Sequence, residues 1–252
     1  MNTDARWDEF DPLDYVWRNY RTVLDVDAHI MSLVRTHFTD HFRRFPGRRV
    51  RGIDVGAGAN LYPSLLMLPW CDEITLLDRS RPNVEYLRRQ LAGDACDSGW
   101  DAFWSELRTD DAYAGVPGGP WAALSRIARV ERGNLFHLLG RAAQWQLGTM
   151  FFVAESISGS PAEFDRSLEC FFGSLQPGAP FAAAFMEHST GYEVGGLAFP
   201  AYDVSESQIT AGVARHAREG DLRIHRIGKP EEVRPGYASM ILACGFRGGG
   251  NP

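Results

Sequence analysis

The residues best placed to do chemistry are a glycine turn and two aspartates. Gly56-Ala57-Gly58 forms the turn, Asp54 stands two positions before it, and Asp78 follows 20 residues after Gly58. Glycine lets the backbone turn sharply and approach a ligand closely, because no Cβ intervenes. This pattern predicts a ligand site at the end of a strand, with two carboxylates beside it.

The residues around the turn narrow the class of ligand that can bind. Leu61 stands where a dinucleotide-binding turn has its third glycine, so an oxidoreductase that binds a dinucleotide is a weaker alternative. Asp54 would repel a pyrophosphate and attract a cation such as an amino-acid ammonium group. Asp78 can accept hydrogen bonds from both ribose hydroxyls of an adenosine. An adenosine that carries an amino acid and no phosphate is S-adenosylmethionine, which is the predicted cofactor.

Other motifs point to one group of proteins. The turn with Asp54 and Asp78 resembles the first two cofactor motifs of class I S-adenosylmethionine-dependent methyltransferases. Within that class the chain resembles the nicotinamide, phenylethanolamine, indolethylamine and thioether methyltransferase family, as a bacterial member. The segments that carry this narrower resemblance are residues 10–20 with two tyrosines five apart, 56–62, 78–83 and 174–178. The resemblance spans residues 10–203 and is weak between 93 and 132.

The resemblance implies a set of cofactor contacts, carried over position by position. They are Tyr15, Tyr20, Asp54, Gly56, Ala57, Gly58, Tyr62, Asp78, Arg79, Asn83, Asn134, Leu135 and Ala154. Asn134 departs from the family, which has an aspartate on the adenine side. An amide still donates to or accepts from an adenine edge but brings no charge. Asn134 is equally well read as a turn residue after a strand.

The acceptor half of the site is expected beyond the later strands, because open parallel sheets bind ligands at the carboxyl ends of their strands. The resemblance implies that Glu187 holds a substrate amine and that Tyr192 faces the substrate. The residues expected to take part in catalysis are Tyr20, Glu187 and Tyr192. For Glu155 and Tyr202, a functional role and an ordinary structural role are left open. No metal site is predicted.

These residues predict a methyltransferase that acts on a small molecule, most readily on nitrogen. Methylation of oxygen, sulfur or carbon is the alternative enzyme function. A catalytically degenerate binding protein is the alternative of another class, which the departures at Asn134 and Gln176 allow. An N-terminal helical segment bearing the two tyrosines is expected to close over the site and exclude water.

Hydrophobic periodicity predicts the elements that position these residues. Strands are expected at 50–55, 73–77, 149–154, 181–186, 222–227 and 238–246, and helices at 27–45, 61–68, 82–91 and 161–175. Strands that alternate with helices indicate a Rossmann-like, doubly wound α/β fold. We expect a seven-stranded, mostly parallel sheet with an antiparallel edge hairpin. The expected organisation is a helical lid at 1–47, a methyltransferase domain at 48–247 with a helical insertion at about 93–132, and a flexible tail at 248–252.

Composition excludes several classes of protein. Of 252 residues, 44% are hydrophobic, which supports a full core. No run approaches 18 apolar residues, so no membrane partner is expected. The net charge of −6 disfavours nucleic acid as a partner. The polar start and four cysteines without metal-ligand spacing indicate a cytoplasmic protein, with a monomer favoured.

Overall fold

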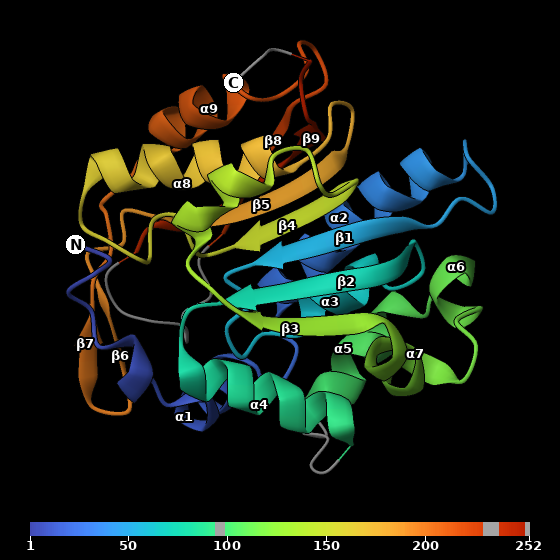
Figure 1. The fold of residues 1–252 in the computed structure, drawn as a ribbon, viewed down its shortest axis with the longest axis horizontal. Helices are drawn as coiled ribbons and strands as arrows, with labels where there is room; N and C mark the ends of the chain where they lie inside the picture. Colours follow the sequence, from blue (N-terminus) through green and yellow to red (C-terminus); the bar gives the residue numbers. More distant parts are fainter. Residues whose placement is uncertain (94–98, 229–236, 250–252) are drawn as a thin grey trace.

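A seven-stranded sheet organises the chain in the computed structural model, which describes residues 1–93, 99–228 and 237–249 (Figure 1). The strands in spatial order are β3 (Ala128–Arg132), β2 (Cys71–Asp78), β1 (Val50–Val55), β4 (Leu147–Phe151), β5 (Pro180–Glu187), β9 (Ser239–Phe246) and β8 (Arg223–Ile227). All neighbours from β3 to β5 are parallel, whereas β9 runs antiparallel to both β5 and β8. The predicted Rossmann-like sheet and its antiparallel edge hairpin are therefore confirmed.

The order of the strands fixes where a ligand binds. The chain runs outward from β1 to β2 and β3, then returns to the other side of β1 as β4. Asp54 pairs with Leu76 of β2 on one side and Thr149 of β4 on the other. Doubly wound sheets bind their ligands at such a reversal, beyond the carboxyl ends of the strands. Asp54, the glycine turn and Asp78 all lie at that edge.

Helices cover both faces of the sheet, and two hydrophobic clusters lie beneath them (Figure 1). One face carries α2 (Asp25–Phe42), α3 (Tyr62–Met67), α4 (Arg81–Ala92), α5 (Gly99–Leu107) and α7 (Gly119–Ile127). The other carries the 3₁₀ helix η2 (Leu135–Arg141), α8 (Pro161–Ser174) and α9 (Glu206–Ala214). Because α2 shares the core of the sheet, any segment that moves as a lid lies before α2. The division at 1–47, 48–247 and 248–252 stays a prediction.

The first twenty residues cross the ligand-binding edge of the sheet. They contain the 3₁₀ helix η1 (Trp7–Glu9) and α1 (Pro12–Asn19), and we call residues 2–20 the strap. In Figure 1 the strap, drawn in blue, lies beside a small hairpin of β6 (Tyr192–Val194) and β7 (Leu197–Phe199). The sequence predicted only a loop there, because three-residue strands are too short for a periodic signal.

Two other expectations needed correction. Strand β4 ends at Phe151 rather than at 154, because Phe152 adopts a left-handed conformation with a φ of 59° that an extended strand cannot contain. The insertion near 93–132 holds three helices, with α6 (Asp111–Ala114) between α5 and α7, and ends in the edge strand β3. Hydrophobic periodicity did not predict β3, because the sequence of this strand is charged and partly exposed. Residues 94–98 lie outside the described part of the chain.

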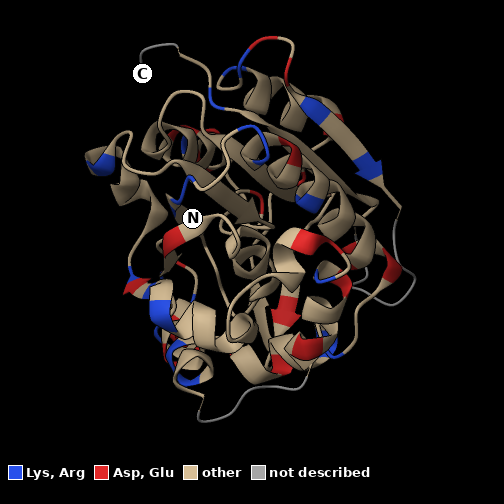
Figure 2. Ribbon diagram, turned by 90° about the vertical axis from the view of Figure 1, so that its right-hand side faces the viewer, with Lys and Arg blue, Asp and Glu red and all other residues tan. Residues whose placement is uncertain are grey.

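The surface has no single sign of charge on the side shown in Figure 2, where basic and acidic residues are interspersed. Within the described residues, the structure contains no helix long and apolar enough to cross a membrane.

Candidate functional site

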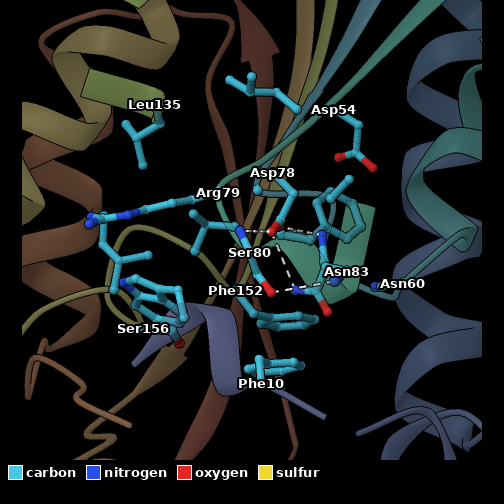
Figure 3. Close-up of a pocket in the computed structure, with 18 of the residues that line it drawn as sticks. Phe10, Asp54, Asn60, Asp78, Arg79, Ser80, Asn83, Leu135, Phe152 and Ser156 are labelled. Carbon is cyan, nitrogen blue, oxygen red and sulfur yellow. Dashed lines mark hydrogen bonds between the residues drawn. The ribbon is translucent and has the colours of Figure 1, made fainter. Parts of the chain in front are cut away.

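A cavity opens at the carboxyl ends of β1, β2 and β4, beneath the strap (Figure 3). Most of the expected cofactor residues line it. These are Tyr15, Asp54, Gly56, Ala57, Gly58, Asp78, Arg79, Asn83, Asn134 and Leu135. The structure therefore brings together expected residues from four separate parts of the sequence at one site.

The glycine turn forms the part of the wall nearest to β1. Gly56 has a φ of 66°, and a Cβ at this position would lie 2.6 Å from a methyl group of Val153. Gly58 has a φ of 59°, and its backbone N–H donates to Asp78 Oδ2 over 2.8 Å. Both positions favour glycine, because a side chain would be strained in this conformation.

Asp78 is held in place by backbone and side-chain donors at the end of β2. Its Oδ1 accepts from the backbone N–H of Ser80 over 2.7 Å and from Asn83 Nδ2 over 3.3 Å (Figure 3). Burial raises the pKa of Asp78, and these hydrogen bonds oppose that rise. The Asn83 Oδ1 atom is buried without a hydrogen-bond partner in the described part of the chain. A ligand hydroxyl between Asp78 and Asn83 could therefore donate a hydrogen bond to an oxygen of either residue.

Asp54 is the second carboxyl group of the cavity wall. Thr149 Oγ1 donates to its Oδ1 over 2.8 Å, and Ser64 Oγ donates to its Oδ2 over 3.3 Å. Burial raises the pKa of Asp54 to about 7. No lysine, arginine or histidine pairs with it among the described residues. A cation bound nearby would stabilise its charged form.

Aromatic rings close the cavity on the side of the strap. Phe10 and Tyr15 from the strap, Phe152 from the turn after β4 and Tyr192 from the hairpin all line it. The Phe10 ring centroid lies 5.3 Å from that of Tyr15. The Tyr192 hydroxyl donates to the backbone oxygen of Ser156 over 3.3 Å. This end of the site is apolar, with tyrosine hydroxyls as its polar groups.

Three of the expected cofactor residues lie behind the cavity wall. Tyr20, Tyr62 and Ala154 are buried and are not among the described residues that line the cavity. Asn60, which does line it, donates through Nδ2 to the Tyr20 hydroxyl over 3.2 Å. Burial raises the pKa of both tyrosines. Their position indicates that they support the wall through Asn60 and through ring contacts.

Glu187, the expected acceptor-binding carboxylate, is hydrogen-bonded to residues that do not line the cavity in the described part of the chain. Its Oε2 accepts from Ser239 Oγ over 2.7 Å and from Arg226 Nη2 over 2.8 Å, and its Oε1 accepts from the backbone N–H of Glu206 over 3.0 Å. Burial alone would raise the pKa of Glu187, but these donors and the Arg226 charge hold it below its usual value. Among the described residues, the structure does not bring Glu187 to the cavity. Its expected catalytic role stays a prediction, without a contact that supports it.

The two residues whose roles were left open also have structural partners. Glu155 is fully buried, and its Oε1 accepts from the backbone N–H of Met186 over 3.0 Å. The Tyr202 hydroxyl accepts from Gln208 Nε2 over 3.0 Å. Neither residue is part of the cavity lining that the structure describes.

Sequence reasoning missed several residues of the site. Asn2 accepts hydrogen bonds from Arg79 Nη1 over 2.9 Å at both its backbone and side-chain oxygens, which places the start of the strap beside Asp78. Phe152 faces the cavity because of its left-handed backbone, for which the sequence has no signal. Asn60 could have been found, since it is the one polar side chain that follows the glycine turn.

Solved structures share this fold. Neither a protein-family model nor a curated protein sequence matches the chain. An S-adenosylmethionine-dependent methyltransferase from Methanosarcina mazei is 13% identical, with a TM-score of 0.55 over 82% of this chain and 96% of that chain. The Burkholderia thailandensis 1,6-didemethyltoxoflavin N1-methyltransferase, solved with that compound and S-adenosylhomocysteine, is 15% identical, with a TM-score of 0.53 over 94% and 87%. The N-methyltransferase NodS from Bradyrhizobium japonicum, with S-adenosylhomocysteine, is 10% identical, with a TM-score of 0.55 over 95% and 100%.

These likenesses define the class of fold. The chain has the Rossmann-like fold of class I S-adenosylmethionine-dependent methyltransferases, with a seven-stranded sheet and its antiparallel strand. At such low identity the likeness concerns the fold, and a fold alone does not assign an activity. Function is therefore inferred from the residues of the cavity.

Proposed function

We propose that this protein is an S-adenosylmethionine-dependent methyltransferase that acts on a small-molecule acceptor, at a nitrogen atom. The observation that carries the proposal is the buried Asp78 carboxylate beside the glycine turn, at the end of β2 in a cavity lined by six parts of the chain. Two of the structures that share the fold are N-methyltransferases by name and another is a carbon methyltransferase, so the fold is compatible with a nitrogen acceptor without selecting it.

The cavity residues fit an adenosine that carries an amino acid. The ribose hydroxyls would donate to Asp78, whose oxygens keep lone pairs beyond those used by Gly58 and Ser80. The adenine would lie against Leu135 and Asn134. The Asn134 Oδ1 atom accepts from the backbone N–H of Phe136, so its amide nitrogen is left to bond the adenine edge.

The amino-acid end of the cofactor would lie near Asp54. An ammonium group there would favour the ionised form of this carboxyl group, whose pKa burial has raised to about 7. Gly56 lets the turn pack against Val153 in the cavity wall, because a Cβ at this position would lie 2.6 Å from a Val153 methyl group. When bound, the cofactor supplies a methyl group that its sulfonium charge has already activated.

The protein would contribute position rather than covalent chemistry. Proximity and alignment of two reactants can supply about 7–11 kcal/mol of a barrier. Phe10, Tyr15, Phe152 and Tyr192 would hold the acceptor at the strap side and keep water out. Because Glu187 is bonded to Ser239 and Arg226, an amine acceptor would lose its proton to solvent before the strap closes and would bind in its neutral form.

Two measurements test the proposal. Calorimetric titration with S-adenosylhomocysteine should show binding, whereas a nicotinamide dinucleotide should not bind. Transfer of a labelled methyl group from S-adenosylmethionine should then be measured on panels of amines, pyridines, thiols and phenols. Binding without transfer to any panel would favour a degenerate binding protein, and preference for a dinucleotide would overturn the cofactor assignment.

A further inference from the structure

We propose that a second binding region, outside the cofactor cavity, holds an anionic group of the methyl acceptor through Arg21. This region is a groove between α1 with the segment after it and the β6–β7 hairpin, and we call it the outer groove. The inference rests on the proposed function, since it names the chemical class of acceptor. It predicts acceptors that carry a carboxylate, or a group of the same charge and shape, on the side away from the methylated atom.

The outer groove and the cavity are neighbours. Tyr15 and Tyr192 line both of them, one from the strap and one from the hairpin. A molecule held between these rings would therefore have one end toward the cofactor and the other end in the outer groove. Thr22 and Thr190 also line the groove, on opposite sides, and add hydroxyl groups that can donate hydrogen bonds.

The charges in the groove are not all neutralised. Arg18 bonds to Asp14 Oδ1 over 2.8 Å, and Glu193, the acidic residue of the described lining, acts on the same arginine. Arg21 has no carboxylate partner within the described part of the chain. Its guanidinium lies over the Trp17 ring, with Cζ 4.7 Å from the ring centroid.

Stacking on Trp17 suits Arg21 to bind an anion. The guanidinium carbon lies over the ring, and a guanidinium held against an aromatic ring still has N–H groups that can bond an anion. Those groups match the two oxygens of a carboxylate, and such charge-assisted pairs are short and strong. An arginine in this position would select acceptors by charge without touching the atoms that react.

The binding test uses benzoate and its neutral counterpart benzamide as probes. Their affinities for the protein saturated with S-adenosylhomocysteine are measured by ligand-observed NMR titration. The wild type should bind benzoate about tenfold more tightly than benzamide. Arg21→Gln should remove this preference, and Arg21→Lys should retain part of it. Arg48→Gln is the matched control, because Arg48 also lies over an aromatic ring, that of Phe45, and lines neither the cavity nor the groove among the described residues.

A kinetic comparison extends the test to the reaction. For 4-aminobenzoate and 4-aminobenzamide as acceptors, the ratio of kcat/KM should favour the anionic member in the wild type and fall toward one in Arg21→Gln. Equal affinities of the wild type for benzoate and benzamide, or a preference that survives in Arg21→Gln, would overturn the proposal. A parallel S-adenosylhomocysteine titration of each variant separates the two hypotheses, because loss of the Arg21 effect leaves cofactor binding intact, whereas absence of cofactor binding refutes the proposed function itself.

Discussion

The two ends of the cavity are built in different ways. At the end proposed to hold the ribose, which we call the ribose end, Asp78 is fixed by the backbone N–H groups of Gly58 and Ser80, which belong to the sheet edge and its turns. At the strap end, Phe10 contacts Phe199 with ring centroids 5.2 Å apart, and the partners come from opposite parts of the sequence. The first end is part of the folded core, whereas the second end depends on docking of one segment against another.

Several polar contacts between the strap and the rest of the chain are exposed. Asp8 pairs with Arg132 over 2.8 Å, with both side chains about half exposed, and such pairs contribute only about 0–1 kcal/mol. Less exposed contacts lie at its two ends: Asn2 bonds to Glu163 and to Arg79, which is next to Asp78, and Tyr20 accepts from Asn60. We infer that the ribose end is preformed, while the strap can open to admit ligands and close over them.

The largest effect is expected at the preformed end. Asp78→Asn keeps the shape of the side chain and removes its charge, so the affinity for S-adenosylhomocysteine should fall about 10- to 1,000-fold. Calorimetric titration measures the change. Asp72→Asn is the control, because Asp72 is exposed in the same strand. Unchanged affinity in a folded Asp78→Asn protein would contradict the placement of the ribose.

A second variant addresses the strap end. Phe10→Ala removes the ring that packs between Tyr15 and Phe199. Loss of a packed phenylalanine costs about 3–5 kcal/mol in a full core, and in this small cluster it should speed trypsin cleavage after Arg18 by roughly 30-fold. Phe45→Ala serves as the control, since Phe45 is exposed and outside the strap.

The same assay tests whether the strap is a lid. S-adenosylhomocysteine should slow cleavage of the wild-type strap, because ligand and strap share the cavity. Equal cleavage rates with and without the ligand would show that the strap does not respond to the site it covers.

The affinity for S-adenosylhomocysteine should also depend on pH, through Asp54. Asp54 has a pKa raised to about 7, so it is largely protonated at pH 6 and largely ionised at pH 8. A ligand ammonium favours the ionised form, and the affinity for S-adenosylhomocysteine should therefore rise about tenfold from pH 6 to pH 8. The free energy of unfolding changes in the opposite direction. Folding raises the pKa of Asp54, so the folded state binds this proton more tightly than the unfolded state does, and the free energy of unfolding falls as pH rises toward 7.

Two substitutions check the assignment of this pH effect. Asp54→Asn should flatten the pH dependence of the affinity. Asp27→Asn should not, although burial also raises the pKa of Asp27 to about 7, because Asp27 is outside the described cavity lining. A slope that disappears in Asp27→Asn and persists in Asp54→Asn would place the titrating group outside the cofactor site.

The smallest kinetic effect is expected at Glu187. Its bonds to Ser239, Arg226 and the backbone of Glu206 join β5, β8, β9 and α9. Glu187→Gln should lower the free energy of unfolding by about 1–3 kcal/mol and change kcat/KM by less than about threefold. Thermal unfolding and steady-state kinetics measure these changes. A tenfold loss of kcat/KM at unchanged stability would instead support the acceptor-binding role expected from the sequence.

The sequence by itself determined the parts of the site that local chemistry specifies. The turn at Gly56 and Gly58 follows a buried strand, and Asp78 ends the next one, so both can be located from residue type and spacing. The central strands likewise followed from periodicity, because they are continuous apolar runs. These features depend on neighbours in the chain.

Only the tertiary structure decided what each remaining side chain touches. Glu187 and Asp78 both end strands at the same edge of the sheet, yet only Asp78 lines the described cavity, because Arg226 and Ser239 from the antiparallel hairpin reach Glu187 first. Tyr20 matches a motif but lies behind Asn60. Such contacts join residues far apart in the sequence, and their geometry depends on packing that no local pattern records.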